Sequence, residues 1–281
     1  MNSLKFADAN SSFNDAKFVI FGVPFDSTSS FRSGSRFAPN RIREGSYNFE
    51  TYLMEHDIDL TDVQFHDAGN LDEYGNADEM TGAVEDAVKK ILPKFPIIVG
   101  GEHSLSIGAV KQFREVSVVF IDAHLDFREE YLGIKNSHAC VSRRTCEIVG
   151  VENVFSIGVR SFSREEKNDA EKLGLKYFSS FDVKEKGIEN IIQNLDLKEK
   201  VYFSLDMDGV DPAFAPGVGN PEPFGLTPND VVKCIKILSD RLVGFDVAEV
   251  CPPYDNGNTS LLGARIIRDL IGCAGKIHDK N

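Results

Sequence analysis

Val-Val-Phe-Ile-Asp-Ala-His-Leu-Asp, residues 118–126, is the stretch of the sequence that predicts both a fold and a site. Its four apolar residues are typical of a strand buried on both faces in a parallel sheet. Asp122, His124 and Asp126 then follow at intervals of two. In an extended chain, residues two apart point to the same side, so we expect these side chains to gather past the carboxyl end of the strand. Open α/β sheets bind ligands at that end, and buried charge is costly unless it is neutralised. The stretch therefore predicts half of a metal site.

The whole chain alternates apolar, strand-like segments with helix-like segments. The predicted strands are 17–23, 63–66, 96–99, 117–121, 154–157, 175–178, 201–205 and 242–247. The predicted helices are 39–49, 77–92, 104–113, 138–149, 163–173, 188–194, 227–239 and 258–273. Strict alternation predicts parallel strands with helices on both faces of the sheet. No composition break or repeat divides the sequence, so we expect residues 1–281 to form a single three-layer α/β/α domain. A TIM barrel also has eight strand–helix pairs, and periodicity alone leaves both folds open.

The composition limits the kinds of partner that we expect. The chain has 281 residues and a formal net charge of −13 at pH 7, which argues against a nucleic-acid partner and favours small cationic molecules. Its five cysteines lack Cys-x-x-Cys spacing and are typical of reduced thiols. No segment has the length of a membrane span, and the first residues lack an apolar signal core. We therefore expect a cytoplasmic protein without a membrane partner.

Two further strand ends carry side chains that can bind a metal. Gly100-Gly101-Glu102-His103 interrupts a strand at two glycines and brings a histidine to the start of a helix. This segment could also be only a joint between strand and helix, with His103 as the cap. Asp206 and Asp208 follow another apolar strand. A lone Asp-x-Asp is a weak signal because acids often follow strands in turns, but this is the third strand end of its kind.

A fourth strand end brings two more carboxylates, Asp246 and Glu249. One acid in a buried strand is usually a paired structural group, and two acids require partners. A carboxylate beside a metal site would suit bidentate binding of a guanidinium group.

Two of the remaining histidines, His56 and His278, lie in polar stretches of the sequence. Histidine is often partly exposed in such surroundings, and we expect both at the surface.

Six side chains from three strand ends could together bind metal ions: His103, Asp122, His124, Asp126, Asp206 and Asp208. Four carboxylates and two imidazoles are too many for one tetrahedral zinc and suit two metal ions with bridging carboxylates. Oxygen-rich ligation without thiolate favours manganese. Four carboxylates would balance two divalent cations, whose bound water loses a proton near neutral pH. We therefore expect two Mn²⁺ per chain.

Six motifs in one order resemble those of the arginase–agmatinase family of ureohydrolases. They lie at 22–26, 33–39, 100–103, 122–126, 204–212 and 246–250, and thus cover nearly the whole chain. The resemblance implies a three-layer fold around an eight-stranded parallel sheet, which would exclude the barrel. It also implies a binuclear manganese site and assembly as a homo-trimer or homo-hexamer.

The resemblance implies a role for each candidate ligand. His103 and Asp126 would hold one manganese, His124 and Asp208 would hold the other, and Asp122 and Asp206 would bridge the two. A hydroxide shared by the two ions would attack the guanidinium carbon, and the tetrahedral intermediate would collapse to urea and an amine. Asp122 is therefore grouped with the catalytic residues.

Two residues outside the metal site complete the implied catalytic set. Glu249 would bind the guanidinium group. His138, in Asn136-Ser137-His138-Ala139, matches a histidine that carries a proton to the leaving amine and contacts substrate. The family usually has glycine where this chain has Ala139, which makes the backbone of this loop an open question.

Residues 127–136 are expected to select the substrate. Arginases place small polar side chains here, whereas this chain has Glu129, Glu130 and a Tyr-Leu-Gly run that looks like agmatinases. Acids near the mouth of the site would favour a cationic substrate end, so we expect agmatine to be hydrolysed to putrescine and urea. Alternatively, both glutamates are solvated loop charges, one of them paired with Arg128.

Other activities remain compatible with the same residues. Arginase, guanidinobutyrase or formimidoylglutamase activity would use the same metal pair. A non-catalytic binding or regulatory member of the family is an alternative of another class.

Overall fold

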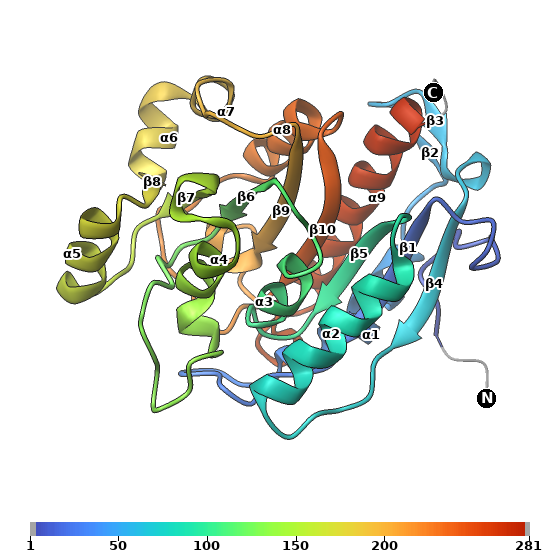
Figure 1. Ribbon diagram of the computed structural model, residues 1–281. Helices are drawn as coiled ribbons and strands as arrows, with labels where there is room; N and C mark the ends of the chain where they lie inside the picture. Colours follow the sequence, from blue (N-terminus) through green and yellow to red (C-terminus); the bar gives the residue numbers. More distant parts are fainter. Residues whose placement is uncertain (1–3, 279–281) are drawn as a thin grey trace.

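The computed structural model of the protein describes residues 4–278, with side chains over 4–275. Its centre is an eight-stranded sheet with the strand order β4-β1-β5-β10-β9-β6-β7-β8, in which all neighbouring strands are parallel (Figure 1). The strands are β1 (Phe18–Val23), β4 (Phe65–Asn70), β5 (Phe95–Gly100), β6 (Val116–Ile121), β7 (Val154–Val159), β8 (Lys176–Ser179), β9 (Lys200–Asp206) and β10 (Leu242–Ala248). Because β4 and β8 are free edges of this sheet, the fold is an open sheet and not a barrel.

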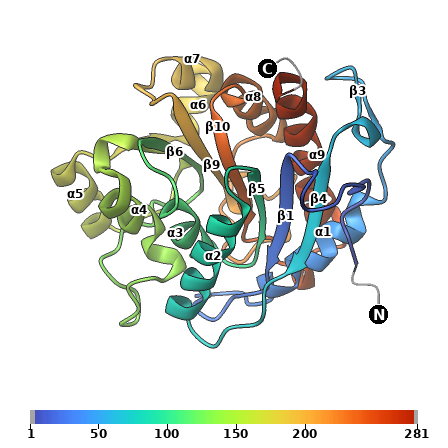
Figure 2. The same cartoon turned by 45° about the vertical axis from the view of Figure 1, so that its right-hand side comes forward.

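Helices cover both faces of the sheet and produce three layers (Figures 1 and 2). One face packs against α1 (Ala38–Ser46), α6 (Ser180–Lys186), α7 (Ile188–Gln193), α8 (Pro228–Leu238) and α9 (Asn258–His278). The other face packs against α2 (Ala77–Ile91), α3 (Leu105–Val110), α4 (Val141–Val149) and α5 (Arg164–Leu173). The smaller elements are the antiparallel pair β2 (Tyr52–Leu53) and β3 (Ile58–Asp59), and the 3-10 helices η1 (Ser35–Phe37), η2 (Leu60–Asp62), η3 (His138–Cys140), η4 (Val151–Asn153), η5 (Met207–Gly209) and η6 (Pro252–Tyr254).

The period-two pattern of the strands produces the two cores. In β1, Phe18 and Ile20 belong to the core under α9, whereas Val19 and Phe21 belong to the core under α2. Every residue of β1 is buried, as expected for a strand covered on both faces. Side-chain capping fixes the helix starts, as in the capping box of α5, where Ser163 and Glu166 bond reciprocally.

The eight predicted strands are all present, and each of the eight predicted helices overlaps a helix of the structure. The segment predicted as a helix over 138–149 begins as η3 and continues as α4. Helix α6 and the pair β2–β3 were not among the predicted elements. The five cysteines form no disulfide with one another, in agreement with the prediction of reduced thiols.

The prediction that His56 lies at the surface is wrong. His56 is buried, with its Nε2 atom 3.3 Å from Asp269 Oδ1 on α9. The polar residues around it in the sequence belong to the β2–β3 pair, which packs on α9. The side chain of His278 lies outside the described residues.

Among residues 4–278, no helix has the length and apolar character that a membrane crossing requires.

Candidate metal centre

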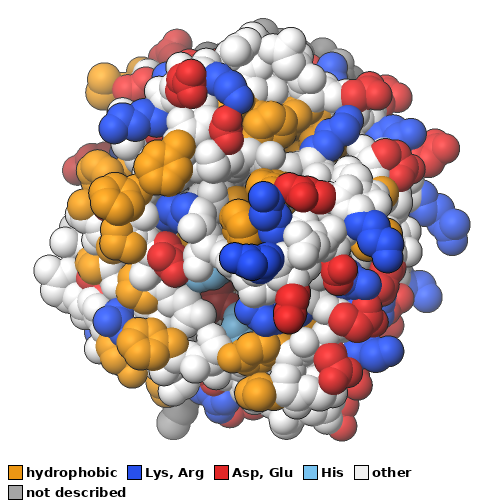
Figure 3. All heavy atoms as spheres, turned by 90° about the vertical axis from the view of Figure 1, so that its left-hand side faces the viewer, with side chains coloured by type: hydrophobic (Ala, Val, Ile, Leu, Met, Phe, Trp, Pro, Cys, Tyr) orange, Lys and Arg blue, Asp and Glu red, His pale blue; other side chains and the backbone are white. Residues whose placement is uncertain are grey.

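Four adjacent strands in the middle of the sheet, β5, β10, β9 and β6, end at the candidate site. β5 leads to His103, β10 to Glu249, β9 to Asp206 and Asp208, and β6 to Asp122, His124 and Asp126. A cavity of about 360 Å³ opens above these strand ends. Figure 3 shows histidine and acidic atoms in a hollow of the surface. The structure thus brings together all six candidate ligands, which the sequence separates by more than one hundred residues.

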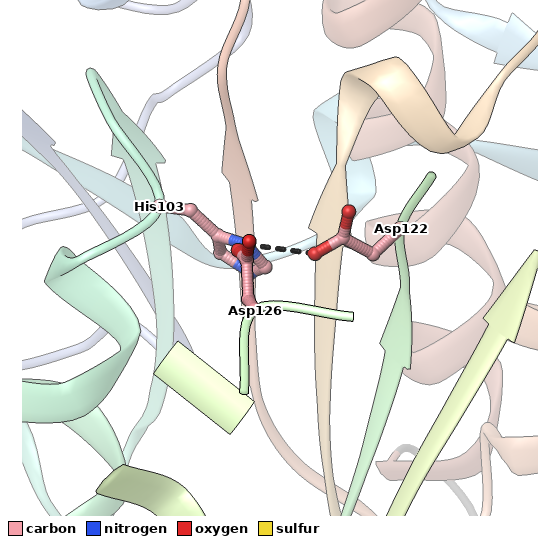
Figure 4. Close-up of side chains that lie close together, drawn as sticks. All are labelled: His103, Asp122 and Asp126. Carbon is pink, nitrogen blue, oxygen red and sulfur yellow. Dashed lines mark ion pairs between the residues drawn. The ribbon is translucent and has the colours of Figure 1, made fainter. Parts of the chain in front are cut away.

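Five of the six ligands form two overlapping groups that share one carboxylate. His103, Asp122 and Asp126 make one group, and Asp122, His124 and Asp208 make the other. In the first group, His103 Nδ1 lies 3.2 Å from Asp122 Oδ2 and 3.5 Å from Asp126 Oδ2, and the side chains point toward one another (Figure 4). In the second group, His124 Nδ1 lies 3.0 Å from Asp208 Oδ2. This arrangement has the form of two neighbouring ion positions bridged by Asp122.

Asp206 joins the first group. Its Oδ2 atom lies 3.2 Å from His103 Nδ1, and its Oδ1 atom accepts a hydrogen bond from Asp208 N at 2.8 Å. This places Asp206 next to ligands of both groups, as a second bridge requires.

Two atoms of the first group are left without hydrogen bonds. His103 Nδ1 and Asp122 Oδ2 are fully buried, and neither has a well-aligned hydrogen-bond partner among the described residues. Buried polar atoms are normally satisfied. A divalent cation between them would satisfy both, so the residues present fit a bound metal.

The charges of the site also suit a bound cation. Burial raises the pKa of Asp206 well above its usual range, and burial with the neighbouring Asp122 carboxylate raises the pKa of Asp126 to about 7. Burial lowers the pKa of His103, but the surrounding carboxylates outweigh it and raise that pKa well above its usual value. Without metal, the cluster therefore holds protons that a cation would displace.

A chain of hydrogen bonds orients His103. Its Nε2 atom lies 2.9 Å from Ser204 Oγ, which donates its own proton to Asp246 Oδ1 at 2.7 Å. Because that proton is committed to Asp246, Nε2 is the donor in the first bond. Asp246 is fully buried and accepts further hydrogen bonds from Ser106 Oγ and Tyr202 OH. Fixing Nε2 as the donor leaves Nδ1 free to bind a metal. These are the partners that Asp246 was expected to require.

Two site residues have an unusual backbone. Asp126 has a φ of 50° and Glu249 a φ of 62°, both in the left-handed region. Such conformations cost free energy in residues other than glycine and occur often at functional sites. Glu249 is held in place by two bonds, from its own N to Gly101 O and from His103 N to its Oε1 atom, each 2.8 Å long. Its other oxygen, Oε2, lies toward Gly219 in the cavity wall.

His138, the first residue of η3, lines the cavity beside the candidate ligands. Its Nδ1 atom lies 2.9 Å from Thr28 Oγ1, and its ring packs edge-on against Tyr131. Burial and the nearby His124 lower the pKa of His138 to about 4. The following Ala139 does not have a positive φ, so the loop accepts alanine where the family usually has glycine.

The position of Glu129 and Glu130 corrects the expectation for the substrate loop. Neither residue lines the cavity above the ligands. Glu129 Oε2 pairs with Arg143 Nη2 at 2.6 Å, because α4 presents basic side chains beneath the loop. Glu130 lines a separate cavity with Lys135. The two glutamates are therefore loop charges that do not reach the site.

Other charged side chains occupy the position expected for these glutamates. Arg32, Arg128 and Glu166 line the cavity, and Arg128 Nη2 lies 3.1 Å from Glu166 Oε2. Sequence reasoning did not identify Arg32, Thr28 or Glu166 as site residues. Glu166 also belongs to the capping box at the start of α5.

Comparisons with known proteins agree on one family. The model of the Arginase family matches residues 16–273. The agmatinase of Bacillus cereus is 36% identical over 95% of this chain and 94% of its own length. The N(1)-aminopropylagmatine ureohydrolase of Thermococcus kodakarensis is 35% identical over 93% of this chain and 92% of its own length. The crystal structure of the agmatine ureohydrolase of Thermoplasma volcanium is 44% identical, covers 100% of this chain and 97% of its own, and superposes with a TM-score of 0.97.

Proposed function

The chain belongs to the arginase family, and from that premise we propose that residues 1–281 form a single domain that hydrolyses agmatine to putrescine and urea. The reaction is a hydrolysis of a carbon–nitrogen bond in a guanidino group. The observation that carries the proposal is the pair of ligand groups sharing Asp122 at the floor of a cavity that Glu249 and His138 line. Relatives named agmatinase and agmatine ureohydrolase, at 36% and 44% identity, support this choice of substrate.

We propose that the site binds two Mn²⁺ ions. His103 and Asp126 would hold one ion, His124 and Asp208 the other, and Asp122 and Asp206 both. When bound, this pair supplies the positive charge that lowers the pKa of water to near neutrality for attack on the guanidinium carbon.

Glu249 binds the guanidinium group of the substrate. Its Oε1 atom already accepts a hydrogen bond from His103 N, so Oε2 is the oxygen left for the substrate. Burial, together with the nearby Glu102 carboxylate, raises the pKa of Glu249 well above its usual range. A cationic guanidinium favours the ionised carboxylate and binds it with charge-assisted hydrogen bonds.

His138 moves a proton to the leaving group. Its lowered pKa keeps the imidazole neutral near pH 7, so one ring nitrogen can accept a proton from water and pass it on. Attack of water on the guanidinium carbon forms one C–O bond and breaks the C–N bond to the alkyl chain. The leaving nitrogen takes both protons of the water, one of them through His138, and departs as an ammonium group of putrescine, while the carbon keeps the oxygen as urea.

One observation favours a second substrate, 4-guanidinobutyrate. Arg32 and Arg128 line the cavity, and Glu166 is paired with Arg128. A carboxylate at the far end of the substrate would be attracted by these two arginines, whereas an ammonium group would have to rely on Glu166. A non-catalytic role is disfavoured, because a site without function would have no reason to retain six converging ligands and two strained residues.

We further propose that the chain assembles as a homo-trimer or homo-hexamer in the cytoplasm. Exposed aromatic side chains such as Phe181 and Phe224, 60% and 72% exposed and in contact with each other, are suited to burial between copies. Five cysteines that form no disulfide fit a reducing compartment. Light scattering coupled to size-exclusion chromatography would measure the number of copies.

Urea release tests the activity most simply. The manganese-loaded protein is incubated separately with agmatine, arginine and 4-guanidinobutyrate, and urea is measured along with the amine product. We expect urea and putrescine in equal amounts, with the highest kcat/KM for agmatine. A higher kcat/KM for 4-guanidinobutyrate would select the second substrate, and urea from none of the three would contradict the proposal.

A further inference from the structure

Thr28 connects His138 to a buried carboxylate. The Thr28 side chain is buried after β1, and its Oγ1 atom lies 2.9 Å from His138 Nδ1 and 2.6 Å from Glu102 Oε1. Glu102 is itself buried. These three residues form a continuous chain of hydrogen bonds from the protein interior to the cavity.

The partners of Glu102 determine the direction of these bonds. Its carboxylate accepts hydrogen bonds from Thr28 N at 2.8 Å, Thr28 Oγ1 at 2.6 Å and Ser104 Oγ at 2.6 Å. The two hydroxyl contacts, each 2.6 Å long, have the length of charge-assisted hydrogen bonds to an ionised carboxylate. An ionised carboxylate only accepts hydrogen bonds, so the single proton of the Thr28 hydroxyl is directed to Glu102.

The lone pairs of Thr28 Oγ1 then serve His138. The backbone N of His138 and the hydroxyl of Ser137 also donate to Oγ1, at the longer distances of 3.2 and 3.3 Å. With the hydroxyl proton committed to Glu102, the bond at 2.9 Å requires a proton on Nδ1 of the ring. A neutral histidine carries one ring proton, so Nε2 is left as the unprotonated nitrogen.

We propose that Thr28, held by Glu102, is a positioning residue that fixes the orientation of His138 and its Nδ1-protonated tautomer, with Nε2 as the proton acceptor in the cavity. The inference rests on the proposed function in one respect, since it matters for catalysis only if His138 transfers a proton there.

Anchoring of the loop does not account for the hydroxyl. The backbone N of Thr28 already bonds Glu102 Oε2, and Asp26 Oδ2 independently accepts a hydrogen bond from Gly34 N at 2.7 Å. The loop would keep both bonds without the Thr28 side chain. The hydroxyl is thus the part of Thr28 that joins Glu102 to His138.

Three variants separate these roles. Thr28→Val retains the shape and the backbone bond but loses the hydroxyl, whereas Thr28→Ser keeps the hydroxyl. Thr81→Val is the matched control, because Thr81 is a buried threonine of α2 whose hydroxyl bonds Asp78 O. We expect Thr28→Val to lower kcat for agmatine by about tenfold or more with little change in KM, and to shift the pH profile of kcat. We expect Thr28→Ser to keep the wild-type kcat and the wild-type pH profile. We expect Thr81→Val to leave kcat and the pH profile unchanged.

Nitrogen NMR of protein with isotope-labelled histidine identifies the tautomer of His138. The measurement uses metal-free protein and does not depend on turnover. In the metal-free wild type we expect His138 to carry its proton on Nδ1. In Thr28→Val we expect a mixture of tautomers, because the remaining hydroxyl at Nδ1, Ser137 Oγ at 3.3 Å, can donate or accept.

Glu102→Gln provides an independent test, also in case Thr28→Val does not fold. The glutamine carbonyl is expected to face Thr28 N, which puts the amide nitrogen beside Thr28 Oγ1. The amide then donates to the hydroxyl, whose proton turns toward His138 Nδ1, and the ring proton moves to Nε2.

The outcomes distinguish the inference from the function on which it rests. An unchanged tautomer in both Thr28→Val and Glu102→Gln overturns the role of Thr28, whatever the activity. An altered tautomer with unchanged kcat also overturns it as a positioning role. If His138→Asn retains wild-type turnover, the failure lies in the proposed proton transfer and not in the hydrogen-bond chain.

Discussion

Ser204 and Asp246 lie opposite each other on the neighbouring strands β9 and β10, and Ser204 Oγ donates a hydrogen bond of 2.7 Å to Asp246 Oδ1. This bond sets the ring of His103, whose Nε2 atom donates to the same hydroxyl. The register of two strands at the centre of the sheet thus determines which nitrogen of His103 faces the metal site.

Ser204→Ala should weaken metal binding. Loss of the hydroxyl leaves His103 Nε2 without its acceptor, and removal of such an outer partner typically lowers metal affinity about 10- to 100-fold. Isothermal titration calorimetry with Mn²⁺ measures the change. Ser156→Ala is the control, because Ser156 is also buried in the sheet and its hydroxyl has no hydrogen-bond partner among the described residues. Equal affinities for the two variants would contradict the role of Ser204.

Asp122→Asn should lower the activity and raise the stability of the metal-free protein. Asp122 is the carboxylate shared by both ligand groups, so we expect urea release to fall by at least about 100-fold, more than the loss of an outer partner. The metal-free variant should be more stable than the metal-free wild type by about 0.5–2 kcal/mol, because a buried charge among like charges is removed. Chemical denaturation with and without chelator checks this.

The exposed Asp240 provides the control for this substitution. Asp240→Asn removes the same charge at the surface and should alter neither metal content nor activity. An Asp122→Asn protein that binds two Mn²⁺ ions and turns over at the wild-type rate would exclude the shared carboxylate.

Metal affinity should depend on pH in a defined direction. Burial raises the pKa of Asp126 to about 7 in the metal-free protein, so below that pH the carboxyl group carries a proton that the ion must displace. Affinity for Mn²⁺ should therefore fall as the pH falls through about 7, with protons released on binding. Titrations in buffers of different ionisation enthalpy measure the protons released. Binding without proton release at pH about 6.5 would contradict the assignment of Asp126 as a ligand.

Arg128→Gln should shift the substrate preference toward agmatine. Arg128 is the ion-pair partner of Glu166 in the cavity, and removing it leaves the Glu166 carboxylate to a cationic substrate end. The ratio of kcat/KM for agmatine to that for 4-guanidinobutyrate should rise by about tenfold, as expected for the change of one charged contact. Arg164→Gln, at an exposed position of α5, is the control. A ratio that is the same in both variants would place substrate selection elsewhere.

The strands and the metal ligands could be predicted because they depend on local patterns. An unbroken apolar run that ends in acids and histidines, as at 118–126, indicates both a buried strand and a polar strand end. The carboxyl ends of neighbouring parallel strands meet at one edge, which is how His103 and Asp208 come together. The order of the strands was not predictable from the pattern, and the resemblance implied only the three layers and the eight parallel strands; the order is known from the structure.

The contacts around the site could not be predicted because they depend on residues distant in sequence. Thr28 lies 110 positions from His138, and no local pattern relates the two. The ion pair of Glu129 has a similar cause: the sequence offered Arg128 beside it as a partner for one of the two glutamates, whereas the structure pairs Glu129 with Arg143 on α4. His56 was misjudged because the helix that buries it begins two hundred residues later.

The central claim is a pair of manganese ions that share Asp122, and a crystal structure of the manganese-loaded protein tests it most directly. Anomalous scattering locates each ion independently of the protein atoms. We predict two ions about 3.5–4 Å apart, one contacting His103 and Asp126, the other His124 and Asp208, and both contacting Asp122. A single ion, or two ions that do not both contact Asp122, would contradict the account.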